Sequence, residues 1–191
     1  MRRKLGQFFF RYRSYTPIPL LILMVLYAQP TWLSFVKGGL LVILGESLRI
    51  WSVAYAGGET RTRKVGASAL VTAGPYALVR NPLYLANTLI YTGVALMANF
   101  WMPWLLLLVW VWCGVQYYFI ILLEEERLLE LFGEAYEAYR RTVPRILPAL
   151  RPQFPMNSLS PNLRGALASE RSTLLNLILV VGLLSVRMAL I

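Results

Sequence analysis

Long apolar runs constrain the fold of this chain more than any other feature of its sequence. A helix needs about 20 mostly apolar residues to cross the hydrocarbon core of a bilayer. Hydrophobic residues make up 58% of the 191 residues, against about 45–50% in soluble domains. The pattern predicts an all-α integral membrane protein with about five transmembrane helices, at Pro17–Ala28, Trp32–Ala56, Leu83–Phe100, Trp104–Leu123 and Thr173–Ile191.

The first of these runs, Pro17–Ala28, is short for a membrane span. It follows a basic segment, as the apolar core of a signal peptide does. That segment, MRRKLGQFFFRYR, is long and rich in aromatic residues, and the later YAQPTW is a poor cleavage site. We therefore expect a short or tilted first helix that turns at Gln29–Pro30.

Basic residues are unevenly distributed along the chain. There are 19 Lys and Arg against 9 acidic residues, for a net charge of +10. They cluster near the N-terminus, in residues 57–82 and in residues 124–171, whereas the turns at 29–31 and 99–103 carry no charge. Cytoplasmic segments of membrane proteins carry the excess of Lys and Arg, so we expect these regions on the cytoplasmic side, against anionic lipid. Because the clusters flank membrane spans, we expect no nucleic-acid partner.

The residue types that the chain lacks narrow its chemistry. It contains no His and no Asp, so all nine acidic residues are Glu. This excludes His-based triads, His–metal clusters and pairs of catalytic Asp, and we predict no metal site. The one cysteine, Cys113, lies within a span, where a buried thiol is usually inert. Any chemistry must use Glu, Arg, Lys, Tyr, Asn, backbone groups or a bound cofactor.

Two polar regions on the predicted cytoplasmic side are candidates for a binding site. Residues 57–82 are polar and rich in glycine and hold Pro75 and Pro82, which indicates an ordered loop. In residues 124–145 apolar side chains recur at helical spacing, which predicts an amphipathic helix ending at Pro144. Both regions adjoin the ends of spans, so they can enclose a pocket at the membrane surface.

One ionisable pair lies inside the second apolar run. Glu46 and Arg49 are three residues apart, so they share a helix face and can form an ion pair. Ionisable groups within a span are costly and often functional. This spacing is compatible both with a functional pair and with a structural pair that faces the interior of the bundle.

Two stretches of the sequence resemble a known family. ALVTAGPYALVRNPLYLAN, residues 69–87, is followed about forty residues later by EEERLLELFGEAYEAYRRTVPRILP, residues 124–148. These elements, in this order, are similar to those of the isoprenylcysteine carboxyl methyltransferases and the related membrane phospholipid N-methyltransferases, over about residues 40–148. The resemblance implies an integral membrane enzyme with S-adenosylmethionine as its cofactor.

The resemblance also implies which residues form the site. The cofactor contacts carried over by position are Ser68, Ala69, Leu70, Val71, Tyr76, Asn81, Pro82, Leu83, Tyr84, Glu125 and Glu126, with Glu124 just outside the Glu pair. The candidate catalytic residues are Arg80 and Glu125. These residue types suit S-adenosylmethionine, because aromatic faces and carboxylates can hold its sulfonium and ammonium groups, and Arg can hold its carboxylate.

Two positions depart from the family pattern. Asn81 stands where the family often has His, so this side chain can serve as an anchor but cannot titrate near neutral pH. The turn before the Glu pair, Tyr117–Leu123, has no base where the carboxyl methyltransferases have an Arg for the substrate carboxylate. The alternatives for that role are Arg49, Arg80, Arg127 and Arg140. The acceptor atom stays open between a carboxylate oxygen, an amine nitrogen and a thiol sulfur.

The resemblance divides the chain into two parts. Residues 1–148 are expected to form a membrane methyltransferase domain, and residues 149–191 a linker and an extra C-terminal transmembrane helix. The expected function is methyl transfer at the cytoplasmic membrane face, to a lipophilic acceptor such as a prenylcysteine carboxylate or a phospholipid amine. The alternatives are an NADPH-dependent membrane reductase of the sterol-reductase type and a non-enzymatic membrane scaffold. The oligomeric state stays open.

Overall fold

The computed structural model describes residues 2–57 and 69–190, and every regular element in these residues is helical. The predicted all-α class is therefore confirmed. The elements are α1 (Arg2–Tyr12), α2 (Ile18–Leu26), α3 (Trp32–Ala56), the 3₁₀ turn η2 (Gly74–Ala77), α4 (Pro82–Ala98), α5 (Trp104–Thr142) and α6 (Leu163–Leu190).

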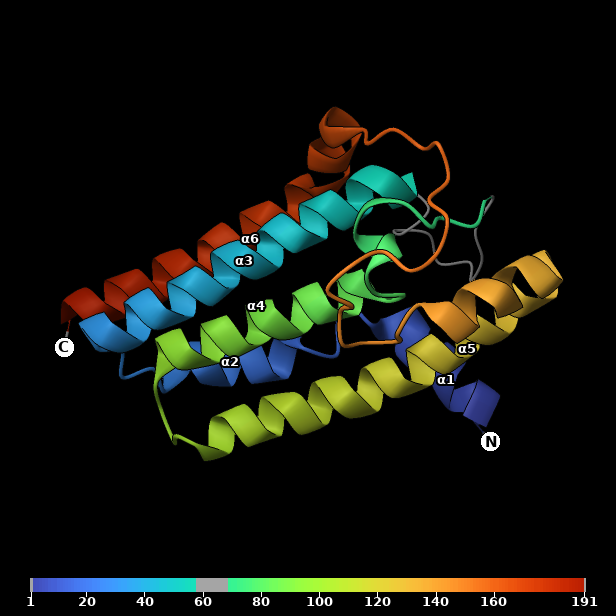
Figure 1. Ribbon diagram of the computed structural model, residues 1–191. Helices are drawn as coiled ribbons and strands as arrows, with labels where there is room; N and C mark the ends of the chain where they lie inside the picture. Colours follow the sequence, from blue (N-terminus) through green and yellow to red (C-terminus); the bar gives the residue numbers. More distant parts are fainter. Residues whose placement is uncertain (1, 58–68, 191) are drawn as a thin grey trace.

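The long helices lie side by side and give the molecule two distinct ends (Figure 1). The α2–α3 and α4–α5 turns and the end of α6 lie at one end, on the left in the figure. The N-terminus, η2 and the segment that follows α5 lie at the other. The predicted loop and the predicted amphipathic helix therefore share one end of the bundle, as the charge distribution indicated.

Local signals set the ends of α3 and α4. Thr31 and Ser34 form a capping box at the start of α3, in which each side chain accepts a hydrogen bond from the backbone N–H of the other. Pro82 opens α4, where its missing N–H costs nothing. Asn99 ends α4 in the left-handed conformation, with φ 50°, which Asn tolerates better than most residues.

The first apolar run forms the expected short helix, and a further helix precedes it. Helix α2 has nine residues, about 14 Å in length. Helix α1, which the sequence analysis did not predict, packs along α5. There the rings of Phe9 and Phe119 stack with centroids 5.9 Å apart. A Cβ on Gly6 would lie 2.9 Å from the carbonyl oxygen of Phe119, so the two backbones approach closely.

Helix α5 extends well beyond its apolar part. It has 39 residues, about 58 Å in length, so the predicted amphipathic helix continues directly from the apolar run Trp104–Leu123. Its geometry is interrupted only at Gly133, where φ is 50° and ψ is −123°. The chain then leaves the helix at Val143, just before Pro144, as expected.

Helix α6 begins ten residues before the apolar run that was predicted from Thr173. It starts at Leu163, so the linker predicted to begin at residue 149 ends in the structure at Asn162. The side chain of Asn162 accepts a hydrogen bond from Gly165 N at 2.8 Å. The backbone N–H of Asn162 donates to Ala54 O of α3 at 2.9 Å. This contact with α3 has no counterpart in the local sequence pattern.

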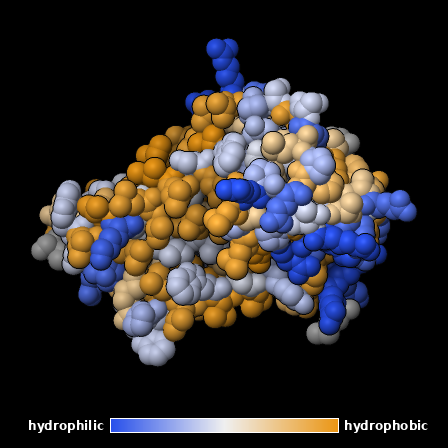
Figure 2. Space-filling model, in the orientation of Figure 1, coloured by the Kyte–Doolittle hydropathy of each residue, from blue (hydrophilic) through white to orange (hydrophobic). Residues whose placement is uncertain are grey.

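Apolar side chains cover much of the outside of the molecule. Figure 2 shows them over the middle of one face, with hydrophilic residues gathered most densely at the end that holds α1 and the end of α5. By length and composition, α5 and α6 are the described helices that can cross a membrane, and α4 is a shorter apolar helix. Only 6% of the most apolar stretch of α6 is buried, which is typical of a helix facing lipid rather than a soluble core. The number of five crossings stays a prediction.

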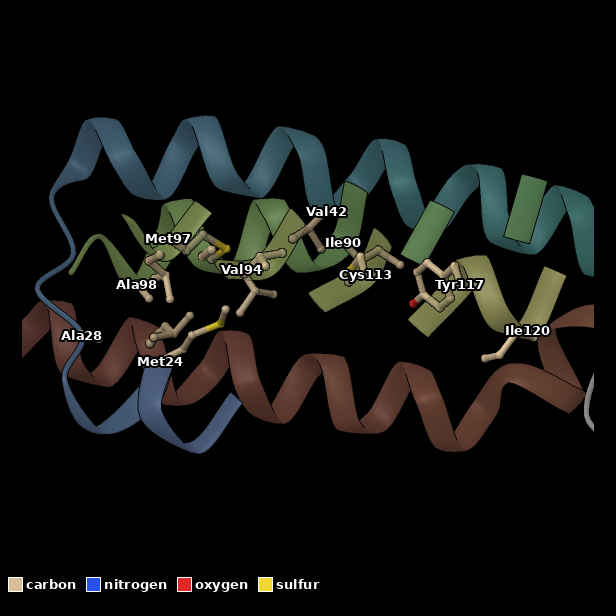
Figure 3. Packing of buried hydrophobic residues seen from close by; sticks show 14 of the residues in the cluster. Met24, Ala28, Val42, Ile90, Val94, Met97, Ala98, Cys113, Tyr117 and Ile120 are labelled. Carbon is tan, nitrogen blue, oxygen red and sulfur yellow. The ribbon is translucent and has the colours of Figure 1, made fainter. Parts of the chain in front are cut away.

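The core of the bundle is filled mainly from α4 and α5, and the other α-helices add single buried residues. Met24 of α2 is fully buried beside Val94 and Met97 of α4, and Cys113 and Tyr117 of α5 extend this cluster toward the other end (Figure 3). The predicted burial of Cys113 is confirmed, with 2% of the residue exposed.

Helices α3 and α4 approach so closely that their contact requires glycine. A Cβ on Gly93 would lie 2.6 Å from the carbonyl oxygen of Gly38, and one on Gly45 would lie 2.8 Å from that of Ala86. Small residues at such contacts let the backbones of membrane helices pack together. By contrast, nothing lies within 4 Å of the Cβ position of Gly39.

Gly38→Ala should destabilise the protein, whereas the neighbouring Gly39→Ala should not. The methyl group at position 38 would overlap the backbone of α4, and overpacking costs about 1–3 kcal/mol. The same methyl group at position 39 enters open space, and Ala is favoured over Gly within a helix by about 1 kcal/mol. Thermal unfolding in detergent compares the two variants. A Gly38→Ala protein that melts no lower than Gly39→Ala would contradict the close contact.

Candidate functional site

A cavity of about 550 Å³ lies at the end of the bundle that holds η2, within the size range of ligand pockets. Its walls come from the α1–α2 turn, α3, residues 69–84 with the first turns of α4, α5 and the first part of α6. It lies where the sequence analysis expected the loop and the amphipathic helix to meet.

Most of the predicted cofactor contacts line this cavity. Those that do so are Ala69, Leu70, Val71, Tyr76, Asn81, Pro82, Leu83 and Tyr84, together with the candidate catalytic residue Arg80. Ser68 lies outside the described residues. Of the three consecutive glutamates, Glu124 lines the cavity, whereas Glu125 and Glu126 are not among its described lining residues. The structure therefore brings the predicted site together except at the Glu pair.

A tight turn at Gly74 directs the loop toward the cavity. Its φ angle is 60°, in the left-handed region that glycine adopts without strain, and a Cβ here would overlap the ring of Tyr55 in α3. Pro75 follows within the first turn of η2, where its fixed φ suits a helix start. This turn brings Tyr76 to the cavity wall.

A strap, defined as residues 143–157, crosses the loop and holds it in place. The backbone N–H of Arg80 donates to Pro144 O at 2.9 Å, and the N–H of Ala149 donates to Leu78 O at 2.9 Å. The strap therefore binds the loop on both sides of Val79 through main-chain hydrogen bonds, whose geometry does not depend on side-chain rotamers.

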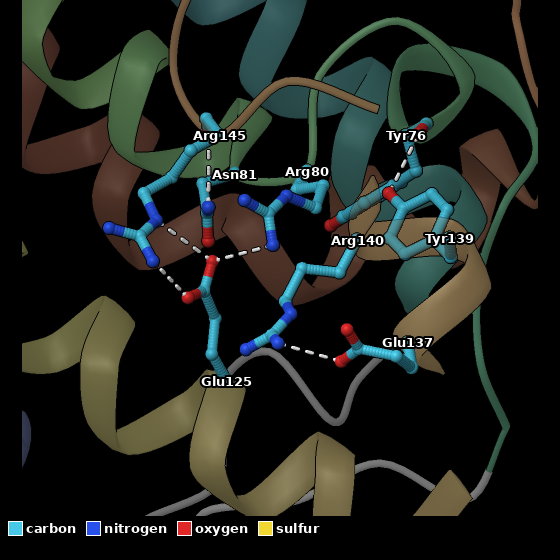
Figure 4. A network of polar contacts seen from close by, with 8 residues as sticks. All are labelled: Tyr76, Arg80, Asn81, Glu125, Glu137, Tyr139, Arg140 and Arg145. Atoms are coloured by element: carbon cyan, nitrogen blue, oxygen red, sulfur yellow. Dashed lines mark hydrogen bonds and ion pairs between the residues drawn. The ribbon is translucent and has the colours of Figure 1, made fainter. Parts of the chain in front are cut away.

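Side chains complete the attachment of the loop (Figure 4). Asn81 Nδ2 donates to the carbonyl oxygen of Arg145 at 3.0 Å. The Tyr139 hydroxyl of α5 donates to Tyr76 O at 2.8 Å. The side chain of Asn81 thus anchors the loop to the strap, in keeping with the anchor role that the sequence allowed. A loop held at this many points loses little entropy when a ligand binds.

Glu124 places a carboxylate at the cavity, just after the apolar run of α5. The Tyr84 hydroxyl donates to Glu124 Oε1 at 2.8 Å. Burial raises the pKa of Glu124 to about 7, while the hydrogen bond from Tyr84 and the charge of Arg13 act to lower it and the nearby Glu125 acts to raise it. The cavity therefore contains a group that changes charge near neutral pH, although the chain has no histidine.

Glu125 is buried between two arginines from different segments. Its Oε1 lies 3.0 Å from Arg80 Nη1 of the loop and accepts a hydrogen bond from Arg145 Nε of the strap at 3.0 Å. Only 7% of its side chain is exposed. The loop, α5 and the strap therefore meet at one carboxylate (Figure 4).

Glu126 lies on the outside of α5. Its side chain is 53% exposed, and its carboxylate is 3.9 Å from Arg3 Nε of α1. Successive residues of a helix point about 100° apart, so three glutamates in a row face the cavity, the loop and the exterior in turn. The rotation of α5 about its axis decides which of them faces the cavity, and the sequence does not show that rotation.

The ion pair expected within α3 is confirmed, and it lies at the cavity. Arg49 Nε and Nη2 donate to the two carboxylate oxygens of Glu46 at 3.0 and 2.7 Å. Arg49 Nη1 also lies 3.0 Å from Glu170 Oε2 of α6. Arg49 and Glu170 both line the cavity. Sequence reasoning missed Glu170 and the cavity-lining Arg13, because no local pattern links either to this site.

The sequence that forms most of this cavity matches a known protein family. Residues 33–135, just over half of the chain, match the family described as phospholipid methyltransferase. The chain belongs to the phospholipid methyltransferase family. The matched segment contains Arg49, the described part of the loop, α4 and Glu124. The strap and α6 lie outside it.

Individual relatives carry a more specific name. The chain is 33% identical over 135 residues to the proteins named protein-S-isoprenylcysteine O-methyltransferase of Homo sapiens, Rattus norvegicus and Mus musculus. The matches cover 64% of this chain and 44% of each relative, so this family member spans less than half the length of the relatives. No solved structure is significantly similar to it.

Glu125→Gln should destabilise the protein much more than Glu126→Gln. Removing one partner of a buried ion pair leaves an uncompensated charge, here on Arg80, and costs about 3–5 kcal/mol. The exposed pair at Glu126 contributes about 0–1 kcal/mol. The two variants remove the same charge at adjacent positions, and denaturant unfolding in detergent measures both. Equal unfolding midpoints would show that Glu125 does not hold the loop and strap together.

Proposed function

We propose that this family member is an S-adenosylmethionine-dependent methyltransferase that acts on a lipophilic acceptor. The observation that carries the proposal is the cavity, which gathers a carboxylate, two tyrosine rings and a guanidinium in one space. These groups are Glu124, Tyr76, Tyr84 and Arg80. All four belong to the segment that matches the family, and the curated relatives are named as methyltransferases.

The residues at the cavity fit the polar groups of S-adenosylmethionine. The Glu124 carboxylate would hold its sulfonium or ammonium group, and the rings of Tyr76 and Tyr84 would face the cation or the adenine. Arg80 would hold a carboxylate of the donor or of the acceptor. Backbone groups of residues 69–71 would bind the adenine edge.

When bound, this cofactor supplies a methyl group that passes from its sulfur to a nucleophile on the acceptor. The protein's part is to align donor and acceptor, which supplies much of the rate in an in-line transfer. The loop, which lines the cavity, would exclude water from around a bound cofactor and so strengthen the electrostatic interactions there. Glu125 would act as a positioning residue that holds Arg80, and Glu126 is not assigned a contact with the cofactor.

The acceptor is proposed to reach the cavity from the bilayer. The cavity is lined by apolar side chains, such as Val53 of α3 and Leu83 of α4, as well as by charged ones. It can therefore bring a lipophilic acceptor beside a charged cofactor. A prenylcysteine carboxylate and a phospholipid amine both have this character. The proposed topology has five membrane crossings, with the N-terminus and the cavity on the cytoplasmic side, because the basic segments gather there.

Calorimetric titration in detergent should show micromolar binding of S-adenosylhomocysteine and no binding of NADPH. Glu124→Gln should weaken that binding at least tenfold, because it removes the carboxylate that faces the ligand's ammonium. Glu126→Gln is the matched control, since it removes the same charge two residues away on the exposed side of α5, and it should leave Kd within about twofold.

The other outcomes of this titration are equally informative. Binding of NADPH alone would favour the reductase function, and binding of neither nucleotide by folded protein would favour the scaffold. An equal loss of affinity in both glutamate variants would contradict the assignment of Glu124 to the site.

The affinity for S-adenosylhomocysteine should rise with pH up to about pH 7 and then level off. The pKa of Glu124 is raised to about 7, so below this pH the carboxyl is increasingly protonated and cannot pair with the ammonium. One such group changes Kd by up to about tenfold per pH unit. Titrations between pH 5.5 and 8 in wild type and Glu124→Gln measure the effect. The variant should show a flat profile, and a flat wild-type profile would refute the role of this group.

A further inference from the structure

A second cavity, of about 410 Å³, is lined by residues of the loop, the end of α5 and the strap. Three arginines line it, Arg80, Arg140 and Arg141, together with the polar side chains of Thr142 and Gln153. Except for Arg80, these residues lie beyond the segment that matches the family. The proposed methyl transfer does not use this cavity.

Arg80 separates the two cavities and lines both. Its side chain is only 9% exposed, yet its buried Nε has no hydrogen-bond acceptor among the described residues. Its Nη1 lies within ion-pair distance of Glu125 but is not aligned for a hydrogen bond. A buried donor without an acceptor costs free energy, so an anion beside Arg80 would be stabilised.

The charges of the polar network beside this cavity, most of which Figure 4 draws, are not balanced. Glu125 is shared by Arg80 and Arg145, and Glu137 is shared by Arg140 and Arg141. Four guanidinium groups against two carboxylates leave this network with a net charge of plus two. Arg140 and Arg141 are 40% and 78% exposed, so both can turn toward a ligand that arrives from water.

We propose that this second cavity, the arginine cleft, binds a phosphate group. Guanidinium groups match phosphate oxygens in geometry and charge, with parallel N–H donors that an ammonium lacks. A guanidinium has five N–H donors, so Arg80 can serve the cleft and the larger cavity through different ones. The cleft lies at the end where the basic segments gather. The phosphate group that the cleft would bind can belong to the headgroup of an anionic phospholipid or to free phosphate.

The test measures phosphate binding directly and does not depend on methyl transfer. Purified full-length protein in a phosphate-free maltoside detergent is titrated with inorganic phosphate, with short-chain phosphatidylglycerol and with acetate, at constant ionic strength. The readout is the midpoint of thermal unfolding, which rises when a ligand binds the folded protein. The variants are Arg140→Gln/Arg141→Gln and the control Arg127→Gln. Arg127 lies on the same helix and pairs with Glu130 three residues away, as Arg140 does with Glu137.

The expected result is a saturable rise of several degrees with phosphate in wild type and in Arg127→Gln, and an affinity at least tenfold weaker in the double variant. Tighter binding of phosphatidylglycerol than of inorganic phosphate would identify a lipid headgroup as the source, and equal binding would identify any accessible phosphate. The proposal is overturned if the double variant responds like wild type, if acetate acts as strongly as phosphate, or if neither phosphate compound shifts the midpoint.

Discussion

The buried carboxylate of Glu125 holds together the three segments on which the cavity depends. Arg80 comes from the loop, Glu125 from α5 and Arg145 from the strap. A buried charge is tolerated only when it is paired and hydrogen-bonded, so the pairing selects one relative position for all three. The main-chain hydrogen bonds between loop and strap and the contact of Tyr139 with Tyr76 then follow from that position.

The parts of the fold that the sequence predicted are those with a local cause. Apolar runs gave the ranges of α3, α4 and the first part of α5, because burial or lipid contact requires such runs. Spacing within one helix gave the Glu46–Arg49 pair. Helix α1 was not predicted, because its polar sequence is stabilised by packing on α5, and the early start of α6 depends on a hydrogen bond to α3.

The candidate site likewise contains residues that local sequence predicts and residues whose place depends on how the helices pack. The predicted contacts between Ala69 and Tyr84 lie at the cavity because they are close in sequence and the turn at Gly74 and the start of α4 fix their backbone. The choice among three glutamates depends on how α5 is rotated, and the contributions of Arg13 and Glu170 depend on helices that are distant in sequence. The matched family segment therefore does not enclose the cavity by itself. The α1–α2 turn and α6 complete its walls in this chain.

The position of the strap in the chain has a consequence for biosynthesis. The loop is synthesised before α4 and α5, but its hydrogen-bond partners extend through Asn157, which accepts a bond from Thr72 N and donates to Leu70 O. At translation rates of about 5–20 residues per second, Asn157 is made roughly 4–15 s after the end of the loop at Asn81. During that interval α4 and α5 are made, whereas α6, whose Glu170 also lines the cavity, has not yet been synthesised. The cavity can therefore be complete only after the ribosome has passed both the strap and the first part of α6.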